Sequence, residues 1–194
     1  MMLNVSRPAA GMHVLDVGGT GTIFSYHLAV LGCQVHTIDI DEKKIQAAAQ
    51  FAQQVPAFSL MDNRLMSMLD MSAYPEGAFD RVFSICVVEH LPSHEAQAQA
   101  MREMVRVLRP GGIVGLTYDV WSPATHGILH QAVAGEIGAF ESPEQVQQVL
   151  VDAVAGQAAV FGNTPVLWGS VDPRDRAPDD FWGSIGTLFL VKNS

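Results

Sequence analysis

The sequence of 194 residues lacks several features that define whole classes of protein. Its only two cysteines, Cys33 and Cys86, lie in separate apolar runs and fit neither a zinc-binding spacing nor a disulfide framework. Only eleven Lys and Arg stand against twenty Asp and Glu, and the resulting net charge of −9 disfavours a nucleic-acid partner. No run approaches the roughly 20 apolar residues that span a bilayer. The sequence therefore predicts a cytoplasmic protein without a membrane or nucleic-acid partner.

The composition indicates a folded chain. Hydrophobic residues make up 48% of it and charged residues 16%, which is typical of a domain with a buried core. No internal repeat or low-complexity segment divides the chain. The length therefore predicts a single domain over residues 1–194.

Short apolar runs alternate with stretches of helical periodicity, as in βα units of a parallel sheet. Helices are expected at residues 22–31, 41–55, 93–108 and 143–154. Strands are expected at residues 13–17, 34–40, 79–88, 113–118, 158–162 and 187–191, with a third strand that ends near residue 61 or runs up to residue 69. The last two strands have no full crossover helix between them and should pair antiparallel.

The predicted fold class is therefore α/β. We expect a Rossmann-like, doubly wound, mostly parallel seven-stranded sheet with one antiparallel strand near the C-terminus. Helices should cover both faces of the sheet. In such folds, ligands bind at the carboxyl ends of the parallel strands.

A glycine-rich turn, Gly18-Gly19-Thr20-Gly21, links the first strand to the first helix, where backbone N–H groups can face a ligand. Asp16 precedes this turn and would repel a pyrophosphate, while Ile23 stands where the dinucleotide fingerprint has its third glycine. These residues disfavour a nicotinamide-dependent oxidoreductase, which we keep as an alternative. A carboxylate at position 16 would instead attract a cation, and Asp39 could accept ribose hydroxyls. The pattern indicates an adenosine with a cationic amino-acid tail.

Five motifs, in this order, resemble the class I S-adenosylmethionine-dependent methyltransferases of the small-molecule, type 11-like subgroup. They span roughly residues 12 to 120 and read Val14-Leu15-Asp16-Val17-Gly18-Gly19-Thr20-Gly21, Ile38-Asp39, Phe79-Asp80, Val88-Glu89-His90-Leu91 and Arg106-Val107-Leu108-Arg109-Pro110-Gly111-Gly112. The resemblance implies S-adenosyl-L-methionine as the cofactor. It implies methyl transfer to a small-molecule acceptor.

The resemblance also implies roles for individual residues. The methionine part of the cofactor would be held by Asp16, Gly18, Gly19, Thr20 and Gly21, with Cys86 facing it. Asp39 would bind the ribose hydroxyls and Ile40 would lie against the adenine. Asp70 is expected to accept the adenine amino group, with Met71 beside the ring and Asp62 as the alternative acid. Asp16, Asp39 and Asp70 should then converge on one hollow.

The sequence departs from the family pattern in two ways. Thr20 and Thr22 stand where the family turn has glycines, and a β-branched residue narrows the close backbone approach that glycine permits. The usual N-terminal cap helices are expected to be missing. These departures motivate an alternative function, a catalytically weak or inactive methyltransferase-fold protein that binds partners. In a homodimer, the second subunit could then cover the site in place of the missing cap helices.

Methyl transfer needs a base only when the acceptor must lose a proton. The catalytic residues stay unassigned, with His90 and Asp119 as the candidates. Tyr118, His126 and His130 are further possibilities. The spacing of His126 and His130 places both on one helix face, but no third acidic ligand accompanies them, so no metal is expected.

Overall fold

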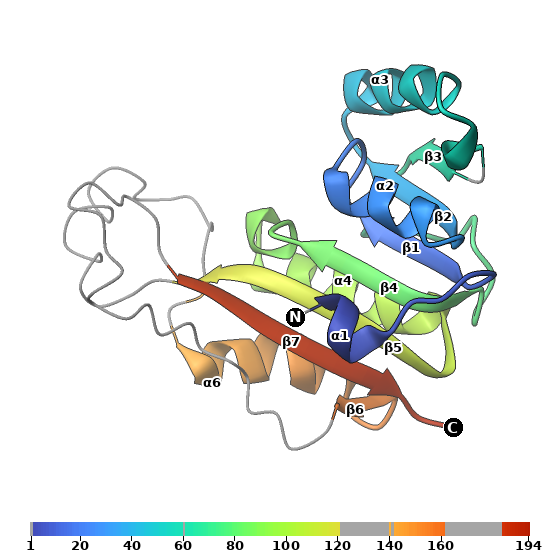
Figure 1. The fold of residues 1–194 in the computed structure, drawn as a ribbon. Coiled ribbons are helices and arrows are strands. Elements are labelled where there is room, and N and C mark those ends of the chain that lie inside the picture. Colours follow the sequence, from blue (N-terminus) through green and yellow to red (C-terminus); the bar gives the residue numbers. More distant parts are fainter. Residues whose placement is uncertain (1, 60, 121–139, 141, 162–183) are drawn as a thin grey trace, which may run out of the picture.

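The computed structural model contains one seven-stranded mixed sheet with helices on both faces (Figure 1). It describes residues 2–59, 61–120, 140, 142–161 and 184–194. The strand order is β3-β2-β1-β4-β5-β7-β6. The strands are β1 (His13–Val17), β2 (Gln34–Asp39), β3 (Met61–Leu65), β4 (Phe79–Ile85), β5 (Leu108–Val120), β6 (Ala158–Val160) and β7 (Ser184–Lys192).

The first five strands pair in parallel, and β7 runs antiparallel to both of its neighbours, β5 and β6. The predicted mixed sheet with one reversed strand near the C-terminus is therefore confirmed. Because β1 to β4 are parallel, their carboxyl ends meet at one edge of the sheet. The order changes direction between β1 and β4, and this is where open α/β sheets form a ligand crevice.

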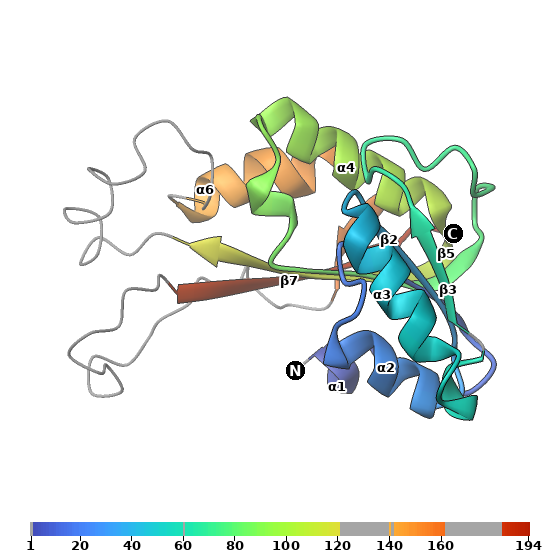
Figure 2. The ribbon, with the colours of Figure 1, turned by 90° about the horizontal axis from the view of Figure 1, so that it is seen from above.

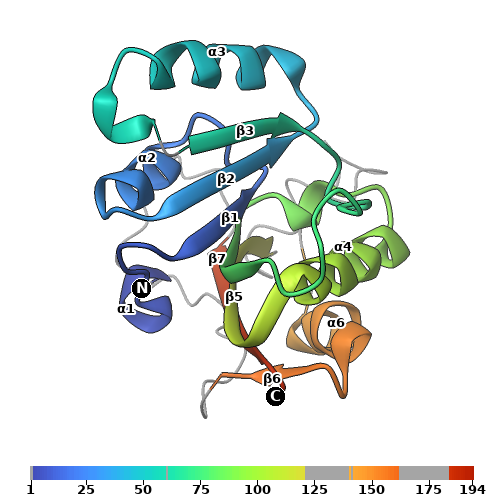
Figure 3. The same cartoon turned by 90° about the vertical axis from the view of Figure 1, so that its right-hand side faces the viewer.

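Helices cover the two faces of the sheet. They are α1 (Met2–Ser6), α2 (Ile23–Val30), α3 (Glu42–Ala52), α4 (His94–Val107) and α6 (Pro143–Val146). Figures 2 and 3 show α1 and α2 on one side of the sheet and α4 and α6 on the other. Among the described residues, every helix is too short or too polar to traverse a lipid bilayer.

Side-chain caps explain where the helices begin. Thr22, Asp41, Ser93 and Ser142 each accept a hydrogen bond from a backbone N–H of the following helix. Such caps satisfy N–H groups that have no partner inside the helix, and each is worth about 1 kcal/mol. The starts predicted at Ser93 and Ser142 are therefore confirmed.

The core forms two apolar layers, one on each face of the sheet. Leu15 and Val17 of β1 belong to the layer beneath α4 and α6, whereas Val14 belongs to the layer beneath α1 and α2. Because strand side chains alternate between the faces, Asp16 shares the face of Val14 and points toward α2. The alternation thus carries a carboxylate into the interior beside the first helix.

Several elements differ from the sequence prediction. The third strand spans only Met61–Leu65, and β5 begins at Leu108, five residues before the predicted start. The helix expected at 143–154 is irregular, because α6 continues into a π-helical turn at Gln147–Val151 and a 3-10 turn at Asp152–Val154. Helix α1 was not predicted. His126, His130 and the charged loop at residues 172–180 lie outside the described residues.

Candidate cofactor site

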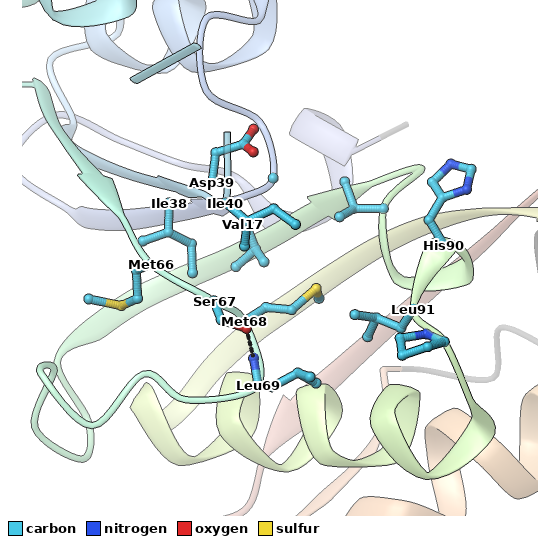
Figure 4. Close-up of a pocket in the computed structure, with 13 residues that line it drawn as sticks. Val17, Ile38, Asp39, Ile40, Met66, Ser67, Met68, Leu69, His90 and Leu91 are labelled. Atoms are coloured by element: carbon cyan, nitrogen blue, oxygen red, sulfur yellow. Dashed lines mark hydrogen bonds between the residues drawn. The ribbon is translucent and has the colours of Figure 1, made fainter. Parts of the chain in front are cut away.

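A cavity of about 260 Å³ opens at the carboxyl ends of β1 to β4 (Figure 4). Most of its lining side chains are apolar, and they come from four separate segments of the chain. The lining residues are Val17, Gly18, Ile38, Asp39, Ile40, Met66, Ser67, Met68, Leu69, Val87, His90, Leu91 and Pro92. Such a lining suits a flat apolar ring with a few polar contacts at its rim.

Gly18 is required at the floor of this cavity. Its φ of +74° lies in the left-handed region, and a Cβ there would come within 2.6 Å of the Val87 methyl groups. Its N–H donates to the carbonyl of Ile38, which joins the ends of β1 and β2. Glycine therefore permits both the turn and the close approach of the segment after β4.

Asp16 lies behind the glycine turn and is only 1% exposed. Ser25 Oγ donates to its Oδ2 at 2.5 Å, and its Oδ1 has no hydrogen-bond partner among the described residues. Burial raises the pKa of Asp16 to about 6, although the hydrogen bond from Ser25 favours the charged form. A cationic group at the turn would lower that pKa and hold the carboxylate charged.

The two threonines of the turn have structural partners. Thr20 Oγ1 donates to Thr37 Oγ1 at 2.9 Å, and Thr37 Oγ1 donates to Asn63 Oδ1 at 2.7 Å. The Thr20 side chain is therefore directed toward β2 and β3, and it does not line the cavity. Thr22 caps α2. Neither threonine lines the cavity, and the effect of the two threonines on cofactor approach at the turn stays a prediction.

Asp39 lines the cavity at the end of β2, as predicted, and is 7% exposed. Its Oδ1 accepts the N–H of Asp41 at 3.0 Å, while its Oδ2 accepts no hydrogen bond and lies 3.5 Å from Lys44 Nζ. The next residue, Ile40, is 77% exposed although it lines the cavity. A polar acceptor and an exposed apolar side chain therefore stand next to each other at the rim.

The segment after β3 forms one wall of the cavity, and the predicted cofactor-binding residues include none of it. Ser67, Met68 and Leu69 line the cavity, and Ser67 Oγ accepts the N–H of Leu69 at 3.2 Å (Figure 4). The available signal was the apolar character of Met66, Met68 and Leu69. The sequence allows these residues to extend the third strand, whereas β3 ends at Leu65.

Asp70 and Met71 do not line the cavity. Asp70 is exposed, and its Oδ1 accepts the N–H of Ser72. Met71 is buried in the core, and its N–H donates to Glu103 Oε2 at 2.8 Å, so that group is already used. Asp62 lies near the start of β3, at the opposite edge of the sheet, where it pairs with Arg64. Of the three aspartates expected to converge, Asp39 lines this cavity, whereas Asp16 and Asp70 do not.

The segment between β4 and α4 brings further polar residues to this edge. His90 lines the cavity and is exposed. Cys86 and Asp119 do not line it; they lie together with Glu89 beyond its wall. Burial and the nearby Asp119 charge raise the pKa of Glu89 to about 7.

The architecture defines a Rossmann-like α/β domain with its ligand crevice at the carboxyl edge of the sheet. A model of the methyltransferase domain family matches residues 15–116 of the chain. The chain therefore belongs to this family, the class I S-adenosylmethionine-dependent methyltransferases, and the resemblance seen in the motifs is confirmed.

Individual relatives agree with this assignment. Over 119 residues, the chain is 33% identical to a ubiquinone biosynthesis O-methyltransferase of Xanthomonas oryzae, covering 61% of this chain and 48% of that protein. The chain thus spans about half the length of the curated relatives it matches.

Solved structures share the fold. The [4+2]-cyclase SpnF aligns with a TM-score of 0.72 at 20% identity, over 98% of this chain and 79% of that one. Phosphoethanolamine N-methyltransferase 2 of Haemonchus contortus, solved with S-adenosyl-L-methionine, aligns with a TM-score of 0.69 at 16% identity, over 100% and 51%. A cyclase and a methyltransferase both align with this chain. The structural likeness therefore defines the fold, and the reaction must be argued from the residues of the site.

Proposed function

We propose that this chain binds S-adenosyl-L-methionine in the cavity at the ends of β1 to β4 and transfers its methyl group to a small-molecule acceptor. The observation that carries the proposal is the placement of Asp39 and Ile40. A carboxylate with one oxygen free of hydrogen bonds lies beside an exposed apolar side chain at the rim of an apolar cavity. A nucleoside would satisfy the oxygen with its ribose and cover the side chain with its base.

Electrostatics support a cationic ligand. Asp16 is buried with an unpartnered oxygen, and a buried carboxylate without a partner is costly. In the described residues no Lys or Arg forms an ion pair with it. An ammonium or sulfonium group above the glycine turn would lower this cost. We therefore assign the methionine moiety to the turn of Gly18 to Gly21, as the family resemblance implies.

We assign the adenine to the wall formed by Ser67, Met68 and Leu69, in place of Asp70 and Met71. Val17 and Ile38 supply the apolar surface opposite this wall. The backbone groups and the Ser67 hydroxyl at this wall could read the edge of the base. This assignment revises the sequence prediction for the adenine and retains it for the ribose.

When bound, the cofactor would supply a methyl group that is activated by its attachment to a sulfonium. The tasks left to the chain are to orient the acceptor and to exclude water, and alignment of this kind can supply about 7–11 kcal/mol. Besides Asp39, which we assign to the ribose, His90 is the titratable side chain that lines the cavity, so we retain it as the first candidate to take a proton from an acceptor. Asp119 is the second candidate.

Titration calorimetry with S-adenosyl-L-methionine and its demethylated product tests the proposal. We expect Asp39→Ala to weaken binding about tenfold or more, because a hydrogen bond to a charged group is worth about 1.5–3 kcal/mol. Asp70→Ala is the matched control, since it removes an exposed carboxylate outside the cavity, and it should leave the affinity unchanged. Absence of binding at millimolar ligand would refute the proposal. An equal loss of affinity in both variants would indicate that Asp70 contacts the adenine, as the sequence predicts.

A second candidate function is a binding protein, or an enzyme of another reaction, on the same fold. The alignment with a cyclase favours keeping it. It predicts cofactor binding without methyl transfer to any acceptor in a screen with labelled methyl donor. The cytoplasmic location and the homodimer stay predictions, and analytical ultracentrifugation would test the latter.

A further inference from the structure

Three residues outside the cavity bring metal-ligating atoms together. Cys86 follows β4, Glu89 lies in the 3-10 turn at Val88–His90, and Asp119 lies near the end of β5. One ligand atom from each, the thiol sulfur and two carboxylate oxygens, lies within 4.8 Å of the other two. Small side-chain rotations would therefore let a single ion contact all three.

Glu89 is the reason to expect a ligand there. Its side chain has no solvent exposure, its Oε1 accepts the N–H of Asp119 at 3.1 Å, and its Oε2 has no hydrogen-bond partner in the described part of the chain. Among those residues, no Lys, Arg or His forms an ion pair with Glu89 or Asp119. A buried carboxylate without a partner takes up a proton or a cation, and two carboxylates side by side increase that need.

The backbone holds Cys86 in an uncommon conformation. Its φ of +52° is left-handed, which costs a residue other than glycine about 1 kcal/mol or more. Two hydrogen bonds keep it there, since the Cys86 N–H lies 3.0 Å from the carbonyl oxygen and 3.1 Å from Oγ1 of Thr117. Strain of this kind persists where the surroundings position a functional side chain. Here it positions the thiol beside two carboxylates.

We propose that Cys86, Glu89 and Asp119 bind a divalent transition-metal ion of the zinc class. A thiolate ligand favours Zn²⁺ over Mg²⁺ and Ca²⁺, which prefer oxygen ligands only. Catalytic zinc sites have three protein ligands and a fourth position that is open to solvent or substrate, and three ligands are what this cluster offers. The site lies next to the cofactor cavity, because the same segment supplies Val87 and His90 to the cavity wall. The proposal does not depend on methyl transfer.

Titration of the full chain with Co²⁺ and Zn²⁺ tests this site. Co²⁺ bound to a thiolate should give a charge-transfer absorption in the near ultraviolet, and Zn²⁺ should displace it at one ion per chain. Cys86→Ser should abolish the absorption. Cys33→Ser is the matched control: Cys33 is buried elsewhere, where a hydroxyl can keep its bond to the Ala9 carbonyl, and the absorption should be unchanged.

The carboxylates are tested by calorimetry with Zn²⁺. Glu89→Gln and Asp119→Asn should each weaken binding at least ~10-fold, the loss that even outer-shell substitutions can cause. Mg²⁺ should bind far more weakly than Zn²⁺. Absence of the Co²⁺ absorption in the folded wild-type chain would overturn the proposal whether or not the variants fold. An unchanged absorption in folded Cys86→Ser would also overturn it.

Discussion

The carboxylate of Asp16 occupies the space that a side chain on Gly19 would need. A Cβ built on Gly19 would overlap all three atoms of that carboxyl group. Gly19 does not have a left-handed φ, so steric contact with Asp16 is the reason for glycine at this position. The turn and the buried carboxylate therefore depend on each other.

Gly19→Ala should displace either the turn or Asp16. We expect the affinity for S-adenosyl-L-methionine to fall at least ~10-fold and the free energy of unfolding to fall by ~1–3 kcal/mol, as in other overpacked sites. Calorimetry and urea unfolding measure the two effects. Gly156→Ala is the control: Gly156 has a φ of +80° and no neighbour within 4 Å, so it should lose stability and retain affinity. Wild-type affinity in Gly19→Ala would contradict the prediction.

Asp16 should make the stability of the unliganded fold depend on pH. Its pKa is about 6 when folded and near 3.8 when unfolded, so the folded state binds the proton more tightly. The contribution of protonated Asp16 to the free energy of unfolding is fully present below pH 3.8. It is lost as the pH rises through the folded-state pKa of about 6. Two units of pKa correspond to ~3 kcal/mol.

Asp16→Asn should therefore be more stable than wild type at pH 7 by ~1–3 kcal/mol, and the gain should vanish near pH 4. The same variant should lose cofactor binding, because the negative charge is gone. In wild type, affinity should fall as the pH drops through the pKa of Asp16. Urea unfolding at both pH values measures the stability, with Asp70→Asn as the exposed control. If Asp16→Asn is less stable than wild type at pH 7, the charged form of Asp16 contributes to folding and the prediction is wrong.

Lys44 should compete with the cofactor for Asp39. Its Nζ lies 3.5 Å from Asp39 Oδ2, the oxygen without a hydrogen bond, and its positive charge opposes a cationic ligand. Lys44→Met should tighten binding about two- to threefold, since exposed ion pairs are worth up to ~1 kcal/mol. Lys43→Met removes the same charge from the adjacent exposed residue and should change little. Weaker binding in Lys44→Met alone would mean that Lys44 positions Asp39 for the ribose.

Ile40 should contribute to binding without contributing to stability. It lines the cavity yet is 77% exposed, so a ligand would cover surface that folding leaves open. Ile40→Ser should weaken cofactor binding about fivefold, because covering half of an isoleucine is worth ~1 kcal/mol. Ile23→Ser is the matched control, since Ile23 is 89% exposed and does not line the cavity. If the two variants bind the cofactor with equal affinity, the adenine does not lie against Ile40.

The sequence alone determined the order of the strands, the sheet class and the positions of Asp16, Gly18 and Asp39. These follow from local signals, because hydrophobic periodicity and glycine turns act over a few residues. The caps at Ser93 and Ser142 are equally local.

The tertiary structure decided which residues share the cavity and which face one another across strands. Ser67 to Leu69 line the wall because β3 ends at Leu65, and Asp70 falls outside it for the same reason. Thr20 is directed toward Thr37, and Glu89 meets Asp119, only because separate strands end side by side. Such pairings depend on contacts between residues far apart in the chain, and no local pattern encodes them.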